Sequence, residues 1–430
     1  MIKTFTDLFK NKDIRGKIFF TLAMLFIYRL GSAIPVPGVD ATLISASIQD
    51  NSILNMMNLL GGGSFQDMSI FAMGVGPYIT SSIIIQLLSM DVVPALTEMA
   101  KSGQQGRQKM DKITRYLTVI LCMIQAFSLV YTFDHQSTPI LMNSSIASYL
   151  YVATVLTAGT MFLLWIGDRI STKGIGNGVS ILIFAGIVSS IPFQFMQVYS
   201  VLVDSSSSTA MTSGLISFAL YLAMYIVIIV LVIFMQKAER KIPIQYTSSA
   251  QSTGNKNMTF LPLKINSASV IPVIFASAII TAPQMVLTFF PNNQIFTTIS
   301  SILSTGTVLG LCIYGTLIVL FTFFYTNMQI DPSKIAENLG KSGTYIPGIR
   351  PGSETREYVG KVLNRITVLG ASFLLVIALI PYVLPLVTNL PSSVSLGGTG
   401  IIIVVGVAME TTSQLKGQLT QKQYRGFIGK

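Results

Sequence analysis

Ten apolar segments, each close to the length that crosses a lipid bilayer, constrain this chain more than any other feature. A transmembrane helix needs about 20 mostly apolar residues. Of the 430 residues, 51% are hydrophobic and 10% are charged, whereas soluble domains are about 25% charged. The sequence therefore predicts an all-α polytopic membrane protein whose ten transmembrane helices cover Ile18–Ile34, Pro77–Val93, Tyr116–Phe133, Tyr149–Gly167, Gly178–Phe195, Gly214–Met235, Val270–Phe290, Val308–Tyr325, Ile366–Leu386 and Ser393–Met409.

Lysine and arginine fall almost entirely in alternate connections between these segments. Of the 28 such residues, 27 lie in the N-terminal segment, the C-terminal tail and connections 2/3, 4/5, 6/7 and 8/9, and the other five connections hold none. Because cytoplasmic loops carry an excess of Lys and Arg, both termini are expected in the cytoplasm. The exception is Arg29, toward the outer end of the first span, which is expected to snorkel or to pair with an outer-loop acid such as Asp40. The basic N-terminus lacks a small-residue cleavage site, so the first span is expected to be retained.

The ten spans divide into two halves of five, which we assign to residues 1–190 and 191–430. An odd number of spans in each half places the halves in opposite orientation, as in inverted repeats. The second span is interrupted at Gly74–Pro77, and the seventh opens with Ser269–Pro272 and carries Pro283. Breaks at matching positions indicate the functional site in such folds, although Gly and Pro are frequent in membrane helices in any case. A broken helix at membrane depth must be buried or line a water-filled cavity, so the break predicts a pore.

Catalytic and metal-binding patterns are missing from the sequence. The glycine-rich stretch Gly174–Ser180 follows a membrane span and lacks the strand-turn-helix context of a phosphate loop. The single histidine, His135, lies in an outer connection, and Cys122 and Cys312 lie in apolar runs, where we expect small buried hydrophobes. No enzyme activity, metal or cofactor is therefore expected. Because the spans hold almost no ionisable residues, a pore between them would be lined by apolar and small polar groups and sealed by dewetting.

Two cytoplasmic connections are long, about 30 residues in 6/7 and about 40 in 8/9, where helix connections usually run 2–8. In connection 8/9, Arg350 stands between Pro347-Gly348 and Pro351-Gly352. Pro-Gly pairs on both sides of a residue favour a rigid turn that directs its side chain outward. Basic loops alone would satisfy the orientation rule. The length and the Pro-Gly pairs favour a docking surface instead.

The chain resembles the SecY family, the channel subunits of the bacterial Sec protein translocase, from its first span to its tail. Seven stretches carry this resemblance in the same order along the chain: Arg29–Val39, Ser69–Leu88, Gly174–Val188, Glu239–Tyr246, Leu261–Ser277, Ile346–Gly352 and Gly397–Val405.

This resemblance implies two halves of five spans around an hourglass-shaped pore. A re-entrant plug at about residues 53–73, which includes Phe65, Ser69, Ile70, Phe71 and Met73, would fold back before span 2. An aliphatic ring would close the waist, formed by Val75, Ile79, Val179, Ile183, Ile274 and Ile403. A lateral gate between spans 2 and 7, with spans 3 and 8 beside them, would contain Thr80, Gln86, Gln125 and Ala282. We expect Gln86 and Gln125 to latch this gate, because amides in hydrocarbon seek hydrogen-bond partners.

The same resemblance implies the function and the partners. The chain would translocate unfolded signal-bearing polypeptides across the bacterial cytoplasmic membrane and release membrane segments through the gate. SecE and SecG would be its membrane partners. The SecA motor and the ribosome would dock on the long loops through Arg240, Lys241 and Arg350, since basic loops also suit ribosomal RNA.

Two other classes of protein compete with a channel. A secondary transporter for a small solute would share the span number and the inverted repeat, but it predicts buried charge and short loops. A membrane enzyme predicts a catalytic set. The chain has neither the buried charge and short loops of a transporter nor the catalytic set of an enzyme.

Overall fold

Helices form most of this computed structural model, which describes residues 11–39, 64–65, 68–90, 92–134, 141, 145–203, 208–246, 259–287, 294–388 and 398–428. Ten of the described helices correspond to the ten predicted spans, so the predicted fold class is confirmed. They are α2 (Lys12–Ser32), α5 (Gly76–Leu88), α7 (Gly103–Asp134), α8 (Ile146–Lys173), α9 (Gly178–Leu202), α10 (Ser208–Lys237), α11 (Ile271–Leu287), α13 (Val308–Gln329), α15 (Ser353–Thr388) and α16 (Gly398–Ile428).

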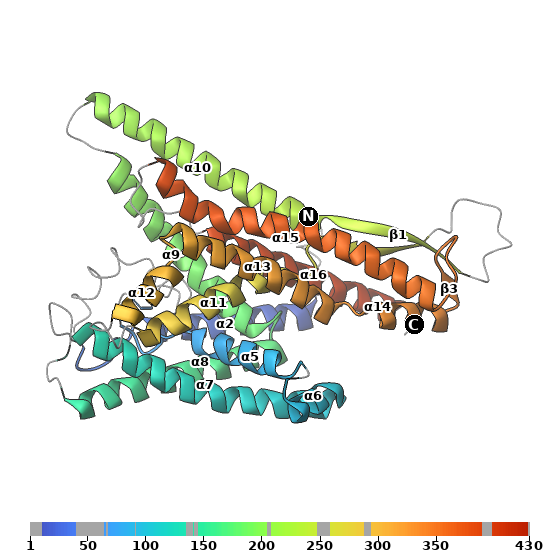
Figure 1. The fold of residues 1–430 in the computed structure, drawn as a ribbon, viewed down its shortest axis with the longest axis horizontal. Helices are drawn as coiled ribbons and strands as arrows, with labels where there is room; N and C mark the ends of the chain where they lie inside the picture. The colour runs from blue at the N-terminus through green and yellow to red at the C-terminus, as the bar shows by residue number, and fades with distance from the viewer. Residues whose placement is uncertain are drawn as a thin grey trace.

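Within the described residues, six helices are long and apolar enough to cross a membrane, namely α7, α8, α9, α10, α13 and α15. Three short helices lie between the spans: α6 (Pro94–Lys101), α12 (Gln294–Leu303) and α14 (Pro332–Lys341). Figure 1 shows α5 to α8 along one side of the molecule, α10, α13, α15 and α16 along the other, and α11 between them. Helices from the two predicted halves pack against each other at α5 and α11 and also at α9 and α16.

Helix α5 is much shorter than the span predicted from the sequence. Its 13 residues reach about 20 Å at 1.5 Å per residue, less than the roughly 30 Å of a bilayer core. It begins at Gly76, two residues after Gly74, whose φ is +54°, and Pro77 lies in its first turn. Proline is favoured there because the first N–H groups of a helix have no intrahelical partner. The predicted break therefore coincides with the start of the helix, within one residue of the predicted start at Pro77.

Helix α7 is longer than predicted, because the basic segment before span 3 is also helical. The exposed residues Arg107, Lys109, Lys112 and Arg115 lie on its first half rather than in a loop. Arg115 pairs with Asp168 of α8 at 2.6 Å, with both side chains about half exposed. A pair of this kind contributes at most about 1 kcal/mol, so it orients the two helices without holding them together.

The two long cytoplasmic connections fold together into one unit, which the sequence analysis did not anticipate. Strand β1 (Glu239–Tyr246) pairs antiparallel with β2 (Thr259–Lys264) and with β3 (Thr344–Tyr345), giving the order β2-β1-β3. Helix α14 and the start of α15 pack beside this sheet. Its own apolar core consists of Ile242, Ile244, Leu263, Leu339, Ile346, Val359 and Ile366. We call this sheet, with α14, the turn at Arg350 and the start of α15, the cytoplasmic unit, after the side on which the sequence predicts it.

The membrane part contains two apolar clusters. The larger joins residues of α5, α9, α11, α13, α15 and α16, and the smaller joins α7, α8 and the segment before α5. Cys122 is buried in the smaller cluster, as expected, but the same expectation was wrong for Cys312, which is exposed on α13. An outward position is tolerated because lipid tails are as apolar as a protein core. His135 and Asp40 lie outside the described residues.

Candidate functional site

The six aliphatic residues expected at the pore waist come from four helices and meet in one cluster. Val75, Ile79, Ile183 and Ile403 are 2–8% exposed, and Val179 and Ile274 are partly buried against them. Val75 and Ile79 are one helical turn apart, as are Val179 and Ile183, so each pair shares a helix face. The cluster also contains many other residues. That all six expected residues belong to it agrees with a ring.

The starts of α5 and α11 have the same backbone geometry. Gly74 has φ +54° and Ser269 has φ +55°, and a proline follows each of them at the third position. The amide of Ile79 donates to the carbonyl of Val75 at 3.1 Å, and the amide of Ile274 donates to the carbonyl of Val270 at 3.3 Å. The matched breaks predicted from the sequence are therefore matched helix starts, one in each half.

The glycine-rich turn Gly174–Gly178 positions α9, the helix that carries the expected ring residues Val179 and Ile183. Gly176 has φ +71°, and the Asn177 side chain caps α9 by accepting from the amides of Val179 and Ser180 at 3.1 and 3.3 Å. A Cβ on Gly178 would overlap the carbonyl of Gly167 on α8. The glycines therefore serve the close approach of α8 and α9, in accordance with the prediction that this stretch is not a phosphate loop.

The segment before α5 is held against α2 by the backbone. The amide of Val36 donates to Met68 at 2.9 Å, the amide of Ile70 donates to Ile34 at 3.0 Å, and Pro35 and Ser69 form a bridge. A side chain at Gly31 would overlap the Phe71 ring. Two helices thus offer bare backbone to this segment, because a Cβ at Gly159 of α8 would likewise overlap the Ile70 carbonyl.

Four of the five expected plug residues divide between the two apolar clusters, and Ser69 is buried beside them. Phe65 and Met73 are buried with α7 and α8, and the Phe65 ring lies 6.1 Å from that of Phe133. Phe71 is buried in the cluster of the ring residues, and Ile70 packs against both clusters. The Ser69 hydroxyl accepts from the Phe71 amide at 3.2 Å. The remainder of the expected plug, residues 53–63 and 66–67, lies outside the described residues.

The residues expected at a lateral gate lie on helices that contact one another, since α11 packs on both α5 and α7. Thr80 and Ala282 are half-buried on α5 and α11, and Gln125 is buried on α7. Gln86 donates to Ser82 of its own helix at 3.0 Å, and its buried Oε1 has no partner among the described residues. The expected latch between Gln86 and Gln125 is therefore not formed by a described hydrogen bond of Gln86.

Arg29 binds the backbone of α9, a partner that the sequence analysis did not consider. Its guanidinium donates to the carbonyls of Ala185 and Gly186 at 3.2 and 3.4 Å, and it also lies 5.4 Å from the ring of Tyr28. Charged groups at membrane depth commonly pair with backbone carbonyls. The rule was available from the sequence, but nothing in the sequence indicates which helix supplies the carbonyls.

The three basic residues expected at a docking surface are exposed on the cytoplasmic unit. Arg240 and Lys241 lie on β1, opposite Leu263 and Pro262 of β2. Arg350 follows β3 in a turn between Gly348 and Gly352, both with positive φ. Its backbone is held by Glu354, which accepts from its amide at 3.3 Å, and by Thr355, which donates to its carbonyl at 2.8 Å. Pairing of β1 with β3 places the two loops on one rigid support.

These features define a class, namely multi-pass helical membrane channels with an aliphatic centre and a buried segment beside it. Within the described residues, no three His, Cys, Asp or Glu side chains form a group that could hold a metal.

The family follows from comparison with known proteins. A family model described as SecY matches residues 69–412. The protein translocase subunit SecY of Staphylococcus carnosus (strain TM300) is 44% identical over 437 residues, which cover 100% of both chains. The chain therefore belongs to the SecY family of protein translocase subunits. This membership confirms the expected class, a channel subunit and not an enzyme.

Two solved structures show the same fold. One, reported for the plug domain of the SecY protein, has a TM-score of 0.68 at 19% identity, with 93% of this chain and 91% of that chain covered. The other, canine Sec61 in a ribosome-channel complex, has a TM-score of 0.63 at 18% identity with the same coverage. Six long apolar helices and the family together make the chain a multi-pass membrane protein.

Proposed function

We propose that this chain forms the channel through which a bacterial Sec translocase passes unfolded, signal-bearing polypeptides across the cytoplasmic membrane. One observation carries the proposal: six aliphatic side chains from α5, α9, α11 and α16 share one buried cluster next to the contact between the two halves. A constriction of aliphatic groups closes to water and ions by dewetting. It also accepts any passing sequence, because it presents no charge or fixed hydrogen-bond pattern.

The plug function is proposed for the segment from Phe65 to Met73. It contacts the ring cluster through Phe71, and its residues 68–70 are fixed by backbone hydrogen bonds to Ile34 and Val36. One neighbouring structure is reported to show that the plug domain of SecY stabilises the closed state and maintains a membrane seal. Backbone hydrogen bonds and apolar packing can break and form again without a chemical change, which suits a part that must leave and return.

The lateral gate is proposed to open between α5 and α11, releasing membrane segments into lipid. Support comes from the packing of α11 on both α5 and α7. We propose that the contact between α11 and α5 separates when the gate opens. Thr80 of α5 and Ala282 of α11 are expected to face each other when the gate is closed. A disulfide requires Cα atoms within roughly 7 Å, so it reports this closed state.

The gate is tested with Thr80→Cys/Ala282→Cys in a background that lacks Cys122 and Cys312. The double variant should export a signal-bearing protein when reduced, stop when oxidised and recover with reductant. Each single cysteine serves as the control and should stay active throughout. Normal export by the fully cross-linked channel would show that α5 and α11 do not separate during transport.

The cytoplasmic unit is proposed as the docking surface for the SecA motor and the ribosome, with SecE and SecG as further subunits in the membrane. The observation behind it is the sheet that fixes Arg240, Lys241 and Arg350 on one exposed support. Two structural neighbours are ribosome-bound, the canine Sec61 and the yeast Ssh1 complexes. Basic side chains would contact ribosomal RNA through its phosphates.

Arg350→Glu tests this surface, with Arg356→Glu as a matched control, because both arginines are exposed in the same unit. The Arg350 variant should insert normally yet fail in ATP-dependent export from reconstituted vesicles, whereas the control should remain active. If both variants exported equally well, Arg350 would be only one of the many basic residues that set the orientation of the chain in the membrane.

Both termini are proposed to lie in the cytoplasm, with five spans in each half. Because α9 runs unbroken across residues 190 and 191, we place the junction of the halves after α9. A membrane-impermeant thiol reagent added outside should label a single cysteine at Ser145, at the start of α8, but not one at Ser342, after α14. Both positions are exposed, and Cys122 and Cys312 are first removed. Labelling of Ser342→Cys from outside would contradict this topology.

A further inference from the structure

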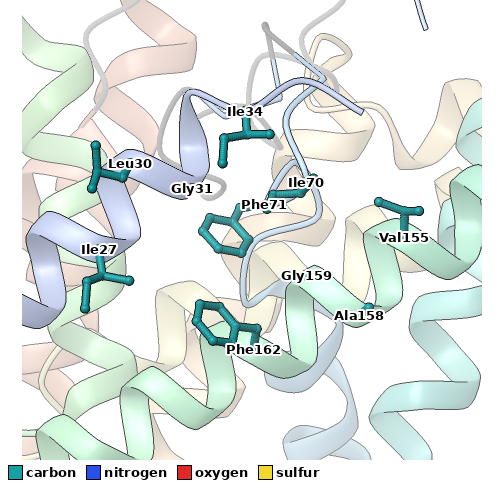
Figure 2. A pocket seen from close by; sticks show the side chains of 10 residues that line it. All are labelled: Ile27, Leu30, Gly31, Ile34, Ile70, Phe71, Val155, Ala158, Gly159 and Phe162. Carbon is teal, nitrogen blue, oxygen red and sulfur yellow. The ribbon is translucent and has the colours of Figure 1, made fainter. Parts of the chain in front are cut away.

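An apolar pocket of about 510 Å³ lies between α2 and α8, and the segment before α5 forms its floor. Figure 2 shows Ile27 and Leu30 of α2 and Ile34, which follows α2, on one side, Ala158 and Phe162 of α8 on the other, and Phe71 between them. No lining residue carries a polar side-chain atom. The pocket therefore offers no side-chain hydrogen bond, and it does not suit polar headgroups or ions.

The rim of the pocket faces the bilayer. Leu30, Ile34 and Phe162 are 43–54% exposed, and under the proposed topology their surroundings are lipid tails. By the proposed topology the α2 residues lie in the outer half of the membrane. The pocket is continuous with the lipid-facing surface, and its volume falls within the roughly 300–1,000 Å³ of ligand sites.

We propose that this pocket binds one acyl chain of an outer-leaflet lipid and that the bound chain stabilises the plug. A void beside packed side chains loses dispersion contacts, and the nearest thin, flexible and apolar object is an acyl chain. The attraction is one of shape, because lipid tails are as apolar as leucine and transfer between them gains nothing. Straight chains that fit should therefore be preferred over branched chains that do not.

The link to the plug follows from what forms the floor. Phe71 packs on the bare backbone of Gly31 and stacks on Phe162 with ring centroids 6.0 Å apart. The Ile70 carbonyl lies on the bare backbone of Gly159. If the segment moves away, the pocket loses its floor, so an acyl chain binds the plugged state better. A ligand shifts a conformational equilibrium by such a difference in affinity. This second part rests on the proposed role of the plug, whereas the binding site does not.

The binding site is tested by photolabelling the chain in nanodiscs with a phospholipid that carries a diazirine on its acyl chain. Peptides containing the α2 and α8 pocket residues should be labelled several-fold more than the exposed face of α10, around Ile226 and Val230. Ala158→Phe, which fills the pocket from its rim, should remove the excess. Ala147→Phe, an exposed alanine on the same helix outside the pocket, should not.

Equal labelling of the pocket and α10, or no effect of Ala158→Phe, would reduce the site to ordinary boundary lipid and overturn the proposal. So would loss of the pocket signal when the chain is labelled together with its native membrane subunits, because a protein helix would then be the occupant. The emission of Trp165, the single tryptophan, checks folding of each variant, since its ring stacks on Phe162 at 5.6 Å.

The coupling to the plug is tested by hydrogen exchange at Ile70 and Phe71. In wild type, exchange should be several-fold faster in methyl-branched lipid than in straight-chain lipid, and Ala147→Phe should behave like wild type. Ala158→Phe should show no such dependence, because its ring already fills the pocket. Exchange that is independent of lipid in wild type would overturn the coupling. Since neither measurement involves export, failure here is distinguishable from failure of the proposed function.

Discussion

Helices α5 and α11 begin with the same backbone geometry but with different residues. At Gly74 the positive φ carries no steric cost, whereas at Ser269 it costs about 1–2 kcal/mol for a residue with a Cβ. The Asn266 side chain donates to the Ser269 carbonyl at 3.1 Å and so offsets part of that cost. The comparison teaches that the two halves share a geometry while each stabilises it with its own chemistry.

The two helix starts also differ in what leads into them. Helix α5 follows the segment buried against α2 and α8, whereas α11 follows β2 of the cytoplasmic unit within a few residues. The β2 end is anchored because the Ile265 amide donates to the Ala238 carbonyl at 2.9 Å. We infer that α5 connects the gate to the seal and that α11 connects it to the docking surface.

The largest expected effect comes from hydrating the waist on either side of the comparison. Ile79→Asn and Ile274→Asn occupy corresponding positions, and each places an amide in an aliphatic constriction. Both should raise the resting ion conductance in planar bilayers and admit substrates with defective signal sequences. Ile226→Asn on the lipid-facing side of α10 is the control and should not leak. A leak from only one of the two ring variants would show that the halves contribute unequally to the seal.

The next effect concerns the two positive φ angles. Gly74→Ala should lower the free energy of unfolding by about 1–2 kcal/mol, because alanine is strained at this φ. Ser269→Gly should raise it slightly, since relief of strain exceeds the roughly 0.5–1 kcal/mol that glycine loses in chain entropy. Denaturant titration in detergent micelles measures both. Opposite signs support the comparison, and loss of stability in both variants would contradict it.

A smaller effect is expected from the side chain that supports Ser269. Asn266→Ala removes one hydrogen bond, worth about 1 kcal/mol, and should destabilise the start of α11 by a comparable amount. In the double variant with Ser269→Gly the loss should be smaller, because the relaxed backbone needs less support. Strictly additive changes in the free energy of unfolding in this double-mutant cycle would show that Asn266 and Ser269 act independently.

The smallest effect is expected at the first-turn prolines. Pro77→Ala and Pro272→Ala should change stability by no more than about 0.5 kcal/mol, because a proline in the first turn replaces an N–H that has no helical partner. Thermal unfolding measures this change.

Pro283 lies inside α11, so Pro283→Ala should straighten that helix and alter gate closure. The rate of oxidation of the Thr80/Ala282 cysteine pair measures this consequence.

Several details of the candidate site were predictable and others were not. The ring positions followed from the family resemblance, and their convergence in one cluster agrees with it. The matched breaks coincide with the starts of α5 and α11, close to where the predicted spans begin. Alternation in Glu239–Tyr246, with Ile242 and Ile244 buried and Lys241 and Pro243 exposed, was a strand signal that the analysis overlooked. The buried position expected for Cys312 was wrong, because an apolar run does not show which face meets lipid.

The sequence by itself determined the number of spans, the expected side of each loop and the scarcity of ionisable residues in the predicted spans. These properties depend on the solvent that each segment meets, so hydropathy and the distribution of Lys and Arg are sufficient to predict them. Only the tertiary structure decided that β1 joins β3, that Arg29 reaches the carbonyls of α9, and that Gly31 and Gly159 hold the segment before α5. These contacts link residues far apart in the chain, and shape complementarity between packed segments leaves no periodic pattern in either of them.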